Sequence, residues 1–184
     1  MLGMNKIIFV TGNQKKFEYA HRFLGDIVTH KKIDLPEIQS LDLQEVVKHK
    51  LNAAWEQLQQ PVIVEDVSLE FESMGRLPGT FIRFFEEEIG LDGLCRLLDD
   101  KTRRCTAKAI IGYRNQHQTR FFYGEIPGTI AENPCGDNYF GFDSILIPDG
   151  YAQTRASLPT KEWEKTYLQI KPWNVVGEFI KEIK

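Results

Sequence analysis

The feature that most constrains the fold is an apolar run that ends in two acids. Pro61-Val62-Ile63-Val64 is followed directly by Glu65-Asp66. A run that is apolar at every position is typical of a strand buried on both faces of a sheet. The carboxyl ends of such strands are where open α/β sheets usually bind ligands. We therefore expect the two carboxylates at a strand tip, either as part of a ligand site or as an ordinary solvated strand end.

The first third of the chain alternates strand and helix signals. Residues 6–10 and 27–33 are predicted strands, and residues 15–24 and 43–58 carry apolar side chains at helical spacing. Together with the strand ending at Asp66, they give the order strand–helix–strand–helix–strand. This order favours an α/β domain with parallel strand pairing.

The second half of the chain changes from alternating units to hairpins. After a break at Leu77-Pro78-Gly79, the pattern predicts helices near 81–88 and 92–98, strands at 107–113, 119–123, 126–131 and 144–147, and closing helices at 159–165 and 173–184. The expected fold is an α/β domain over residues 1–184. We expect two lobes that share a sheet, with a cleft between the lobes.

Composition and charge limit the class of protein. The chain has 184 residues, of which 42% are hydrophobic and 27% charged, which is typical of a globular domain. Its net charge of −3 argues against general binding of nucleic acid, which needs a basic surface. The apolar runs are too short to span a bilayer, and no signal peptide is visible. We expect a cytoplasmic protein with no nucleic-acid or membrane partner.

The cysteines and histidines suggest no disulfide framework and no zinc site. Three cysteines, an odd number, are widely separated at Cys95, Cys105 and Cys135, and the four histidines have no zinc-ligand spacing. Free thiols in a reducing compartment are the simplest interpretation.

A polar turn with two lysines follows the first predicted strand. The segment Thr11-Gly12-Asn13-Gln14-Lys15-Lys16 lies between that strand and a helix. A turn of this kind directs backbone N–H groups at an anion, and the helix dipole adds to the attraction. Two cations on the first helical turn are unfavourable for the helix itself. Their presence there favours an anionic ligand, although a plain exposed turn remains the alternative.

Further candidate residues are scattered along the chain. Glu37 could join Glu65 and Asp66 in holding Mg2+, because such sites use few protein carboxylates together with water and phosphate oxygens. Lys50 lies beside an apolar helix face, where a lysine more often extends to solvent than contacts a ligand. The segment Asn138-Tyr139-Phe140-Gly141-Phe142-Asp143 offers aromatic faces for stacking a base, but such residues are also ordinary core material.

Taken in order, these segments resemble the inosine triphosphate pyrophosphatase family. The matching segments are Thr11-Gly12-Asn13-Gln14-Lys15-Lys16, Asp34-Leu35-Pro36-Glu37, Val64-Glu65-Asp66-Val67-Ser68-Leu69, Gly75-Arg76-Leu77-Pro78-Gly79, Phe140-Gly141-Phe142-Asp143, Pro148-Asp149-Gly150-Tyr151 and Glu164-Lys165. The resemblance spans nearly the whole chain. It implies a long mixed sheet with two lobes, Mg2+ as cofactor, a homodimer, and hydrolysis of a nucleoside triphosphate to the monophosphate and pyrophosphate.

The resemblance also assigns roles to individual residues. Asp66 would orient or deprotonate the attacking water, with Glu65 beside it and Lys16 as the main cation on the triphosphate. Glu37 and Asp66 match metal-binding acids. The residues that match substrate contacts are Thr11, Gly12, Asn13, Gln14, Lys15, Lys16, Lys50, Val67, Arg83, Phe140, Gly141, Phe142, Asp143, Lys165 and Lys171.

The chain departs from the family pattern at the end of the site that reads the base. The family has His-Arg where this chain has Ile170-Lys171, and Trp-Asp-Pro where it has Phe142-Asp143-Ser144. Isoleucine offers no side-chain hydrogen bond, and lysine lacks the planar fork of arginine. The phosphate end matches the family, so hydrolysis of inosine, deoxyinosine or xanthosine triphosphate is expected. The alternatives are a changed base preference or a nucleotide-binding protein with little turnover. A purely structural domain is a third, which would make every polar motif a coincidence.

Overall fold

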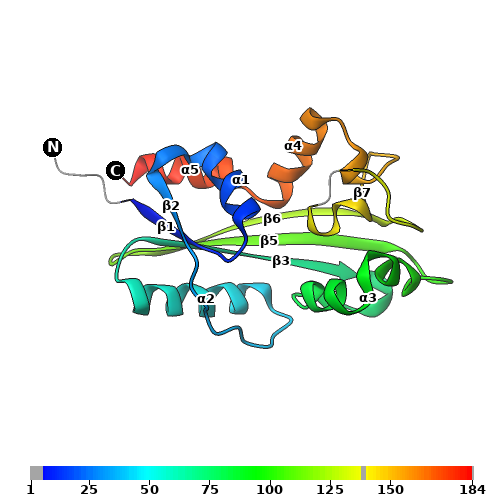
Figure 1. Ribbon diagram of the computed structural model, residues 1–184, viewed down its shortest axis with the longest axis horizontal. Coiled ribbons are helices and arrows are strands. Elements are labelled where there is room, and N and C mark those ends of the chain that lie inside the picture. The colour runs from blue at the N-terminus through cyan, green and yellow to red at the C-terminus, as the bar shows by residue number, and fades with distance from the viewer. Residues whose placement is uncertain (1–5, 138–139, 184) are drawn as a thin grey trace. The chain divides into compact units, whose positions relative to one another are not determined.

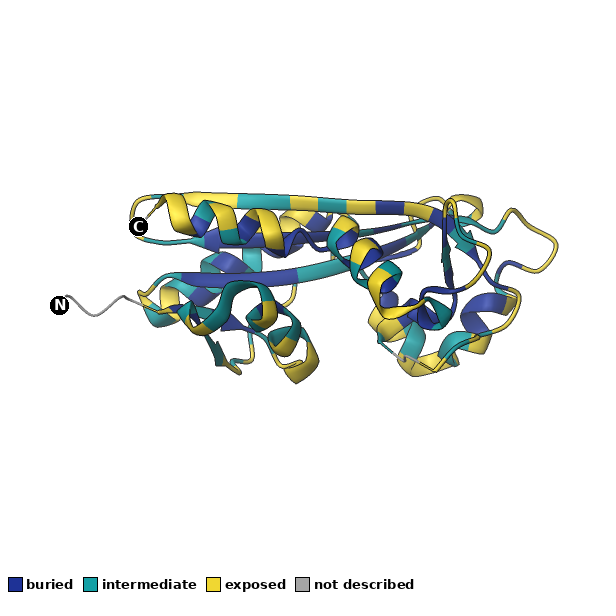
Figure 2. Ribbon diagram, turned by 90° about the horizontal axis from the view of Figure 1, so that it is seen from above, coloured by how far each residue is buried: buried dark blue, intermediate teal, exposed yellow. Residues whose placement is uncertain are grey.

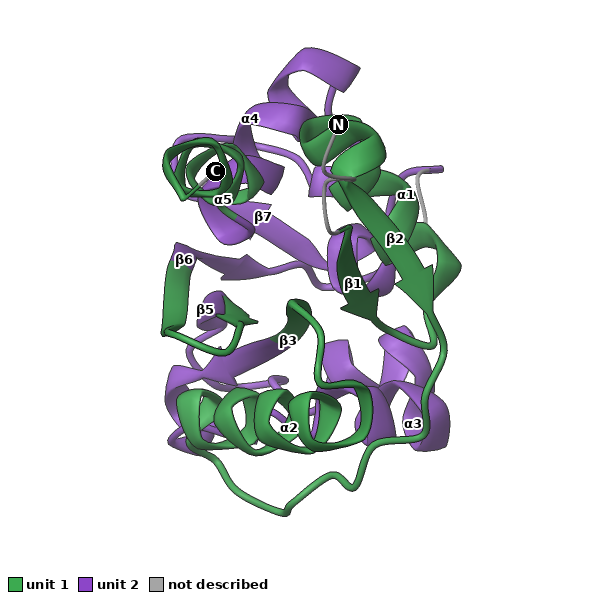
Figure 3. Cartoon of the chain, turned by 90° about the vertical axis from the view of Figure 1, so that its left-hand side faces the viewer, with its two compact units in different colours: residues 1–66, 110–123, 172–184 green, residues 67–109, 124–171 purple. Residues whose placement is uncertain are grey.

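The computed structural model describes residues 6–137 and 140–183, so Asn138 and Tyr139 of the aromatic segment lie outside the described residues. The contacts of the chain divide it into two compact units (Figure 3). Unit 1 comprises Met1–Asp66, Ile110–Tyr123 and Pro172–Lys184, and unit 2 comprises Val67–Ala109 and Gly124–Lys171. None of the described helices is long and apolar enough to cross a membrane.

Seven strands of the described chain form one sheet (Figure 1). The strand order is β2-β1-β3-β5-β6-β7, and β4 pairs with β3. The strands are β1 (Ile7–Val10), β2 (Val28–Lys31), β3 (Val62–Phe71), β4 (Pro78–Gly79), β5 (Arg104–Arg114), β6 (Thr119–Ile130) and β7 (Leu146–Pro148). The helices are α1 (Gln14–Leu24), α2 (Leu43–Leu58), α3 (Ile82–Arg96), α4 (Thr160–Ile170) and α5 (Trp173–Glu182).

The predicted α/β fold with a mixed sheet is confirmed. Strand β1 pairs in parallel with both β2 and β3, as the alternating order of the first third predicts, whereas β7 runs antiparallel to β6. The predicted hairpin is present, with the amide of Asn115 donating to the carbonyl of Gln118 at 3.0 Å. The two strands predicted at 119–123 and 126–131 are a single strand, β6.

In unit 1, helices cover both faces of the sheet. Helices α1 and α5 pack together on one face and α2 lies on the other (Figures 1 and 3). The side chain of Asp42 caps α2 by accepting from two backbone amides. The apolar stripe of α2, including Val47 and Leu51, packs with Val62 and Val64 in one core. Figure 2 shows the buried residues along the strands and the inner sides of the helices.

The acids after Val64 do not lie at a strand tip, contrary to our expectation. Strand β3 continues through Glu65 and Asp66 to Phe71, because Ser68, Leu69 and Phe71 are buried and extend the sheet. Its neighbour β1 is much shorter. β1 ends at Val10, one residue after the pair Phe9–Ile63. The two acids therefore lie where β3 runs on past the carboxyl end of β1, which still leaves them at a sheet edge where ligands bind.

Unit 2 has its own apolar core. The core is built by Leu69 and Phe71 of β3, by Leu94 of α3, and by residues of β5, β6 and β7. Helix α3 is interrupted at Gly90, whose φ of 66° is outside the helical range, so the two helices predicted near 81–88 and 92–98 are both present. Helix α4 extends five residues beyond its predicted end at Lys165, to Ile170.

Candidate active site

The turn between β1 and α1 is held by its own side chains. The amide of Asn13 donates to Oγ1 of Thr11 at 3.1 Å, and Oδ1 of Asn13 accepts from the amide of Lys16 at 3.1 Å. Asn13 is therefore the N-cap of α1, as polar residues at this position often are. Gly12, Asn13, Gln14 and Lys15 are exposed, and the first turn of α1 contains no acid. Here the helix dipole and the lysines both attract an anion.

Lys16 extends from this turn to the first acid of β3. Its Nζ lies 3.1 Å from Oε1 of Glu65, and the side chains of the two residues are 18% and 0% exposed. Burial acts to lower the pKa of Lys16, but the nearby charges of Glu65, Asp66 and Glu37 outweigh it, and the pKa is raised above the ordinary 10.5. Lys16 is therefore a permanent cation at neutral pH.

Lys50 joins the other two predicted acids. Its Nζ lies 2.7 Å from Oδ2 of Asp66 and 2.6 Å from Oε1 of Glu37. The side chain of Lys50 is 15% exposed, that of Asp66 19% and that of Glu37 44%. Lys50 is therefore paired with acids instead of extending to solvent, the commoner alternative for a lysine beside an apolar face, and its assignment as a substrate contact stays a prediction. One ammonium therefore contacts an oxygen of each acid and holds the two carboxylates close together.

Five charged groups thus converge within unit 1, namely Lys16, Glu37, Lys50, Glu65 and Asp66. They come from α1, from α2, from β3 and from the segment between β2 and α2. Carboxylates outnumber ammonium groups by one, so the cluster has capacity for a further cation. The structure brings together the three acids expected to hold Mg2+ and two of the lysines that the sequence singles out.

The donor set suits Mg2+ in its chemistry. Carboxylate oxygens are the protein ligands that this cation prefers, and it usually keeps several waters and takes phosphate oxygens. In the part of the chain that the structure describes, no group of three or more His, Cys, Asp or Glu side chains forms a ready cage. Glu37 and Asp66 fit the few-ligand pattern of Mg2+, and both would hold the ion through carboxylate oxygens.

The aromatic segment lies in unit 2 and is only partly accessible. Phe142 is 7% exposed and packs into the core, and Asp143 is 1% exposed. Asp143 accepts from Nε1 of Trp163 at 2.7 Å and forms an ion pair with Arg155. Burial raises the pKa of Asp143, and Arg155 opposes that shift.

Lys171 sits against two aromatic rings of the same unit. Its Nζ lies 5.0 Å from the ring centroid of Phe140 and 5.6 Å from that of Tyr167, distances typical of cation–π contacts. Lys171 is 5% exposed, and Ile170 beside it is 2% exposed. Gly141 has a φ of 58° and leads from Phe140 into a short 3₁₀ turn.

Three other predicted contacts, Val67, Arg83 and Lys165, also belong to unit 2. Arg83 is exposed on α3, where it pairs with Glu87 at 3.4 Å and lies over the ring of Phe84. Lys165 is exposed on α4, and Val67 is half-buried against the core of unit 2. Their assignment as substrate contacts stays a prediction.

Sequence reasoning missed three members of the buried group around Asp143. Arg155, Trp163 and Tyr167 form a stack, with the guanidinium of Arg155 5.5 Å from the Trp163 ring and that ring 4.9 Å from Tyr167. The spacing of Trp163 and Tyr167 by four residues on a helix is a signal for such stacking. The pairing of Arg155 with Asp143 is long-range and leaves no local signal.

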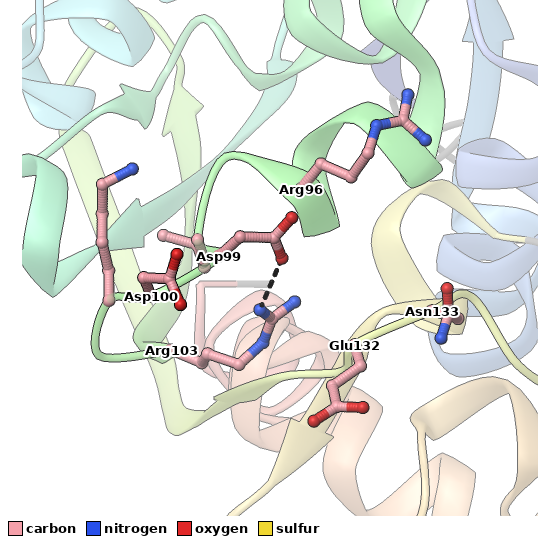
Figure 4. Close-up of a pocket in the computed structure, with 8 residues that line it drawn as sticks. Arg96, Asp99, Asp100, Arg103, Glu132 and Asn133 are labelled. Atoms are coloured by element: carbon pink, nitrogen blue, oxygen red, sulfur yellow. Dashed lines mark hydrogen bonds and ion pairs between the residues drawn. The ribbon is translucent and has the colours of Figure 1, made fainter.

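A shallow polar hollow of about 480 Å³ lies elsewhere in unit 2 (Figure 4). Its charged lining includes Arg103, which already donates to Asp99 and to the carbonyls of Cys95, Ile130 and Ala131. The hollow contains none of the predicted site residues, and its main cation is engaged by protein acceptors.

Comparisons with known proteins agree on one family. The Ham1 family matches residues 7–168. An inosine triphosphate pyrophosphatase 2 of Trypanosoma cruzi is 37% identical over 163 residues, covering 86% of this chain and 83% of that protein. A dITP/XTP pyrophosphatase of Methanopyrus kandleri is 36% identical over 181 residues, covering 96% of each.

Solved structures support the same fold. The Ham1 protein of Staphylococcus aureus has a TM-score of 0.81 at 23% identity, over 97% of this chain and 100% of that one. A HAM1 protein of Coxiella burnetii has a TM-score of 0.83 at 19% identity, with the same coverage. The resemblance inferred from the sequence motifs is confirmed, and the chain belongs to the Ham1 family.

Proposed function

We propose that this protein hydrolyses nucleoside triphosphates to the monophosphate and pyrophosphate, with inosine, deoxyinosine and xanthosine triphosphates as substrates. The observation that carries the proposal is the cluster in which Lys16 meets Glu65 and Lys50 joins Glu37 to Asp66, beside the amide-rich turn at Thr11–Asn13. Two relatives that are named as pyrophosphatases of these nucleotides are 37% and 36% identical to this chain.

In the proposed reaction, the turn and the lysines bind the triphosphate. Lys16 neutralises charge on the phosphates and stabilises the charge that moves onto the pyrophosphate as the anhydride bond breaks. Asp66, or Glu65 beside it, orients a water molecule and accepts its proton.

Mg2+ is part of the proposal, with Glu37 and Asp66 as its protein ligands. The bound ion would neutralise phosphate charge and acidify water. The carboxylates now held by Lys50 would then be shared between that ammonium and the ion. We also propose a homodimer, which rests on the family resemblance, and a cytoplasmic location, which rests on the three free thiols.

The decisive experiment is a panel of nucleoside triphosphates with pyrophosphate detection, with and without Mg2+. We expect Mg2+-dependent pyrophosphate release that falls about 100-fold or more in Asp66→Asn, the range typical for loss of a group that accepts a proton. Glu70→Gln is the matched control, because Glu70 forms a similar pair on the same strand, with Lys108 at 2.7 Å. Release of orthophosphate, or full activity in Asp66→Asn, would refute the proposal.

A second candidate, altered base preference, is favoured by one observation. Lys171 and Ile170 stand where the family has Arg and His, and both are buried. Loss of hydrogen-bond partners at a base edge reduces discrimination by about ten- to a hundredfold per contact. High turnover of standard nucleotides such as ATP in the same panel would support this candidate, and strong selectivity for inosine triphosphate would exclude it.

A further inference from the structure

One histidine of β2 contacts the turn that precedes α1. Nε2 of His30 lies 2.7 Å from the carbonyl oxygen of Thr11. A carbonyl oxygen only accepts hydrogen bonds, so Nε2 carries the proton and donates it to this bond. The contact joins residues 19 positions apart in the chain and is partly buried.

The same imidazole ring also contacts the helix that follows the turn. The ring of Phe17, on the first turn of α1, stacks on that of His30 with the centroids 5.0 Å apart and the planes 16° from parallel. The amide of Phe17 donates to the carbonyl of Asn13 at 3.3 Å. The His30 ring therefore contacts both sides of the turn. Its Nε2 bonds to Thr11 at the start of the turn, and its face packs on Phe17 in the helix that follows.

The backbone of β2 reinforces this contact. The amide of Thr11 donates to the carbonyl of Lys31 at 3.2 Å, so both backbone polar groups of Thr11 are bonded to consecutive residues of β2. Thr11 in turn accepts from the amide of Asn13 through Oγ1 at 3.1 Å. A shift of Thr11 would therefore move the whole amide-rich turn.

We propose that His30 is a positioning residue that fixes the turn at Thr11–Asn13 in the conformation that binds the triphosphate. This inference rests on the proposed function. His30 touches neither substrate nor reacting atoms; it acts through Thr11. A preformed turn binds without first losing conformational freedom, so the effect belongs to substrate affinity.

The variants separate the hydrogen bond from the ring stacking. His30→Phe keeps an aromatic ring against Phe17 but removes the donor. His30→Gln keeps an N–H donor at a comparable distance from the backbone. The matched control is His21→Gln, because His21 is the other histidine beside Phe17, at 5.6 Å between centroids, and its ring nitrogen contacts Asp26 and not the turn.

The measurements are kcat and KM for inosine triphosphate, and the Kd of inorganic tripolyphosphate, which has no base. For His30→Phe we expect KM and Kd to rise about three- to tenfold, the effect of one net hydrogen bond, with kcat changed less than about twofold. His30→Gln and His21→Gln stay near the wild type. Amide hydrogen exchange of residues 11–16 is faster in His30→Phe alone.

Each contrary result has a distinct meaning. Wild-type KM and Kd in His30→Phe would overturn the proposal, as would a fall in kcat alone, which signals a smaller folded fraction. Equal impairment of His30→Gln and His30→Phe would also overturn it, because the donor would then be irrelevant. A wild-type protein that releases no pyrophosphate would refute the proposed function, and amide exchange would still decide the role of His30.

Discussion

Nζ of Lys50 lies 2.7 Å from Oδ2 of Asp66, and the same nitrogen contacts Glu37. One ammonium thus sits between the two carboxylates proposed to hold Mg2+. A metal ion bound there would compete with this ammonium for the same carboxylate oxygens. We therefore expect removal of Lys50 to strengthen metal binding and to weaken catalysis.

We expect Lys50→Met to lower kcat/KM at least about tenfold, because a cation facing the phosphates is lost. The Mg2+ concentration that gives half-maximal activity should fall, since Glu37 and Asp66 lose their competing ammonium. Titration of activity with Mg2+ measures both quantities. Lys108→Met is the matched control, because it removes the lysine of the Glu70 pair. An unchanged or higher Mg2+ requirement in Lys50→Met would contradict the proposed metal ligands.

Substitutions in the Lys16–Glu65 pair should affect stability and activity separately. Glu65 is 0% exposed in its side chain, so Lys16→Met would leave a buried carboxylate without this ammonium and lower the free energy of unfolding by about 3 kcal/mol. Replacing both residues, as in Lys16→Met/Glu65→Leu, should restore most of the stability but none of the activity. Thermal melts and pyrophosphate release test the two parts independently.

The same pair has a defined pH dependence. The pKa of Lys16 is raised in the folded protein, so its stabilising contribution is complete below its ordinary value of 10.5 and is lost as the pH rises through the folded pKa. The difference in melting temperature between the wild type and Lys16→Met should therefore stay constant at neutral pH. It should shrink only above about pH 10.5. A difference that disappeared near neutrality would contradict a charged Lys16–Glu65 pair.

The sequence predicted the elements whose signals are local. The turn before α1, the apolar stripe of α2 and the two helical segments of α3 are set by residues within a few positions of one another, and all are present. The acids of β3 and the turn were identified from the apolar run and from the polar turn between a strand and a helix, and the family resemblance then assigned their roles. The cleft between two lobes and the roles of single residues stay predictions.

What the sequence could not predict depends on partners far apart in the chain. The tip position expected for Glu65 and Asp66 was wrong because the length of β3 depends on its pairing and on the core around Leu69 and Phe71. Likewise, Arg155 pairs with Asp143 across 12 residues in a buried setting, and no local pattern marks that contact. From sequence alone, an arginine is ordinarily expected to be exposed.

Substitution of Lys171 should change the selectivity for the base but not the binding of the triphosphate. Its ammonium lies against the rings of Phe140 and Tyr167 in unit 2, whereas the cluster of charged residues belongs to unit 1. In Lys171→Met, we expect the ratio of kcat/KM for inosine triphosphate to that for ATP to change about tenfold, whereas inhibition by tripolyphosphate stays unchanged. Lys171→Arg keeps the cation and is the matched control. Equal losses for every substrate would mean that Lys171 only supports the fold.

The cysteines predict a simple pattern of chemical modification. Cys95 and Cys105 are buried and Cys135 is exposed, and all three are free thiols. Burial raises the pKa of Cys105 to about 12, so its thiol stays protonated and unreactive near neutrality. Brief treatment with iodoacetamide at about pH 8 should therefore give one adduct per folded chain, at Cys135, and three after unfolding. Mass spectrometry of the digested protein locates the adducts, and modification of Cys105 in the folded state would show that the core of unit 2 opens to solvent.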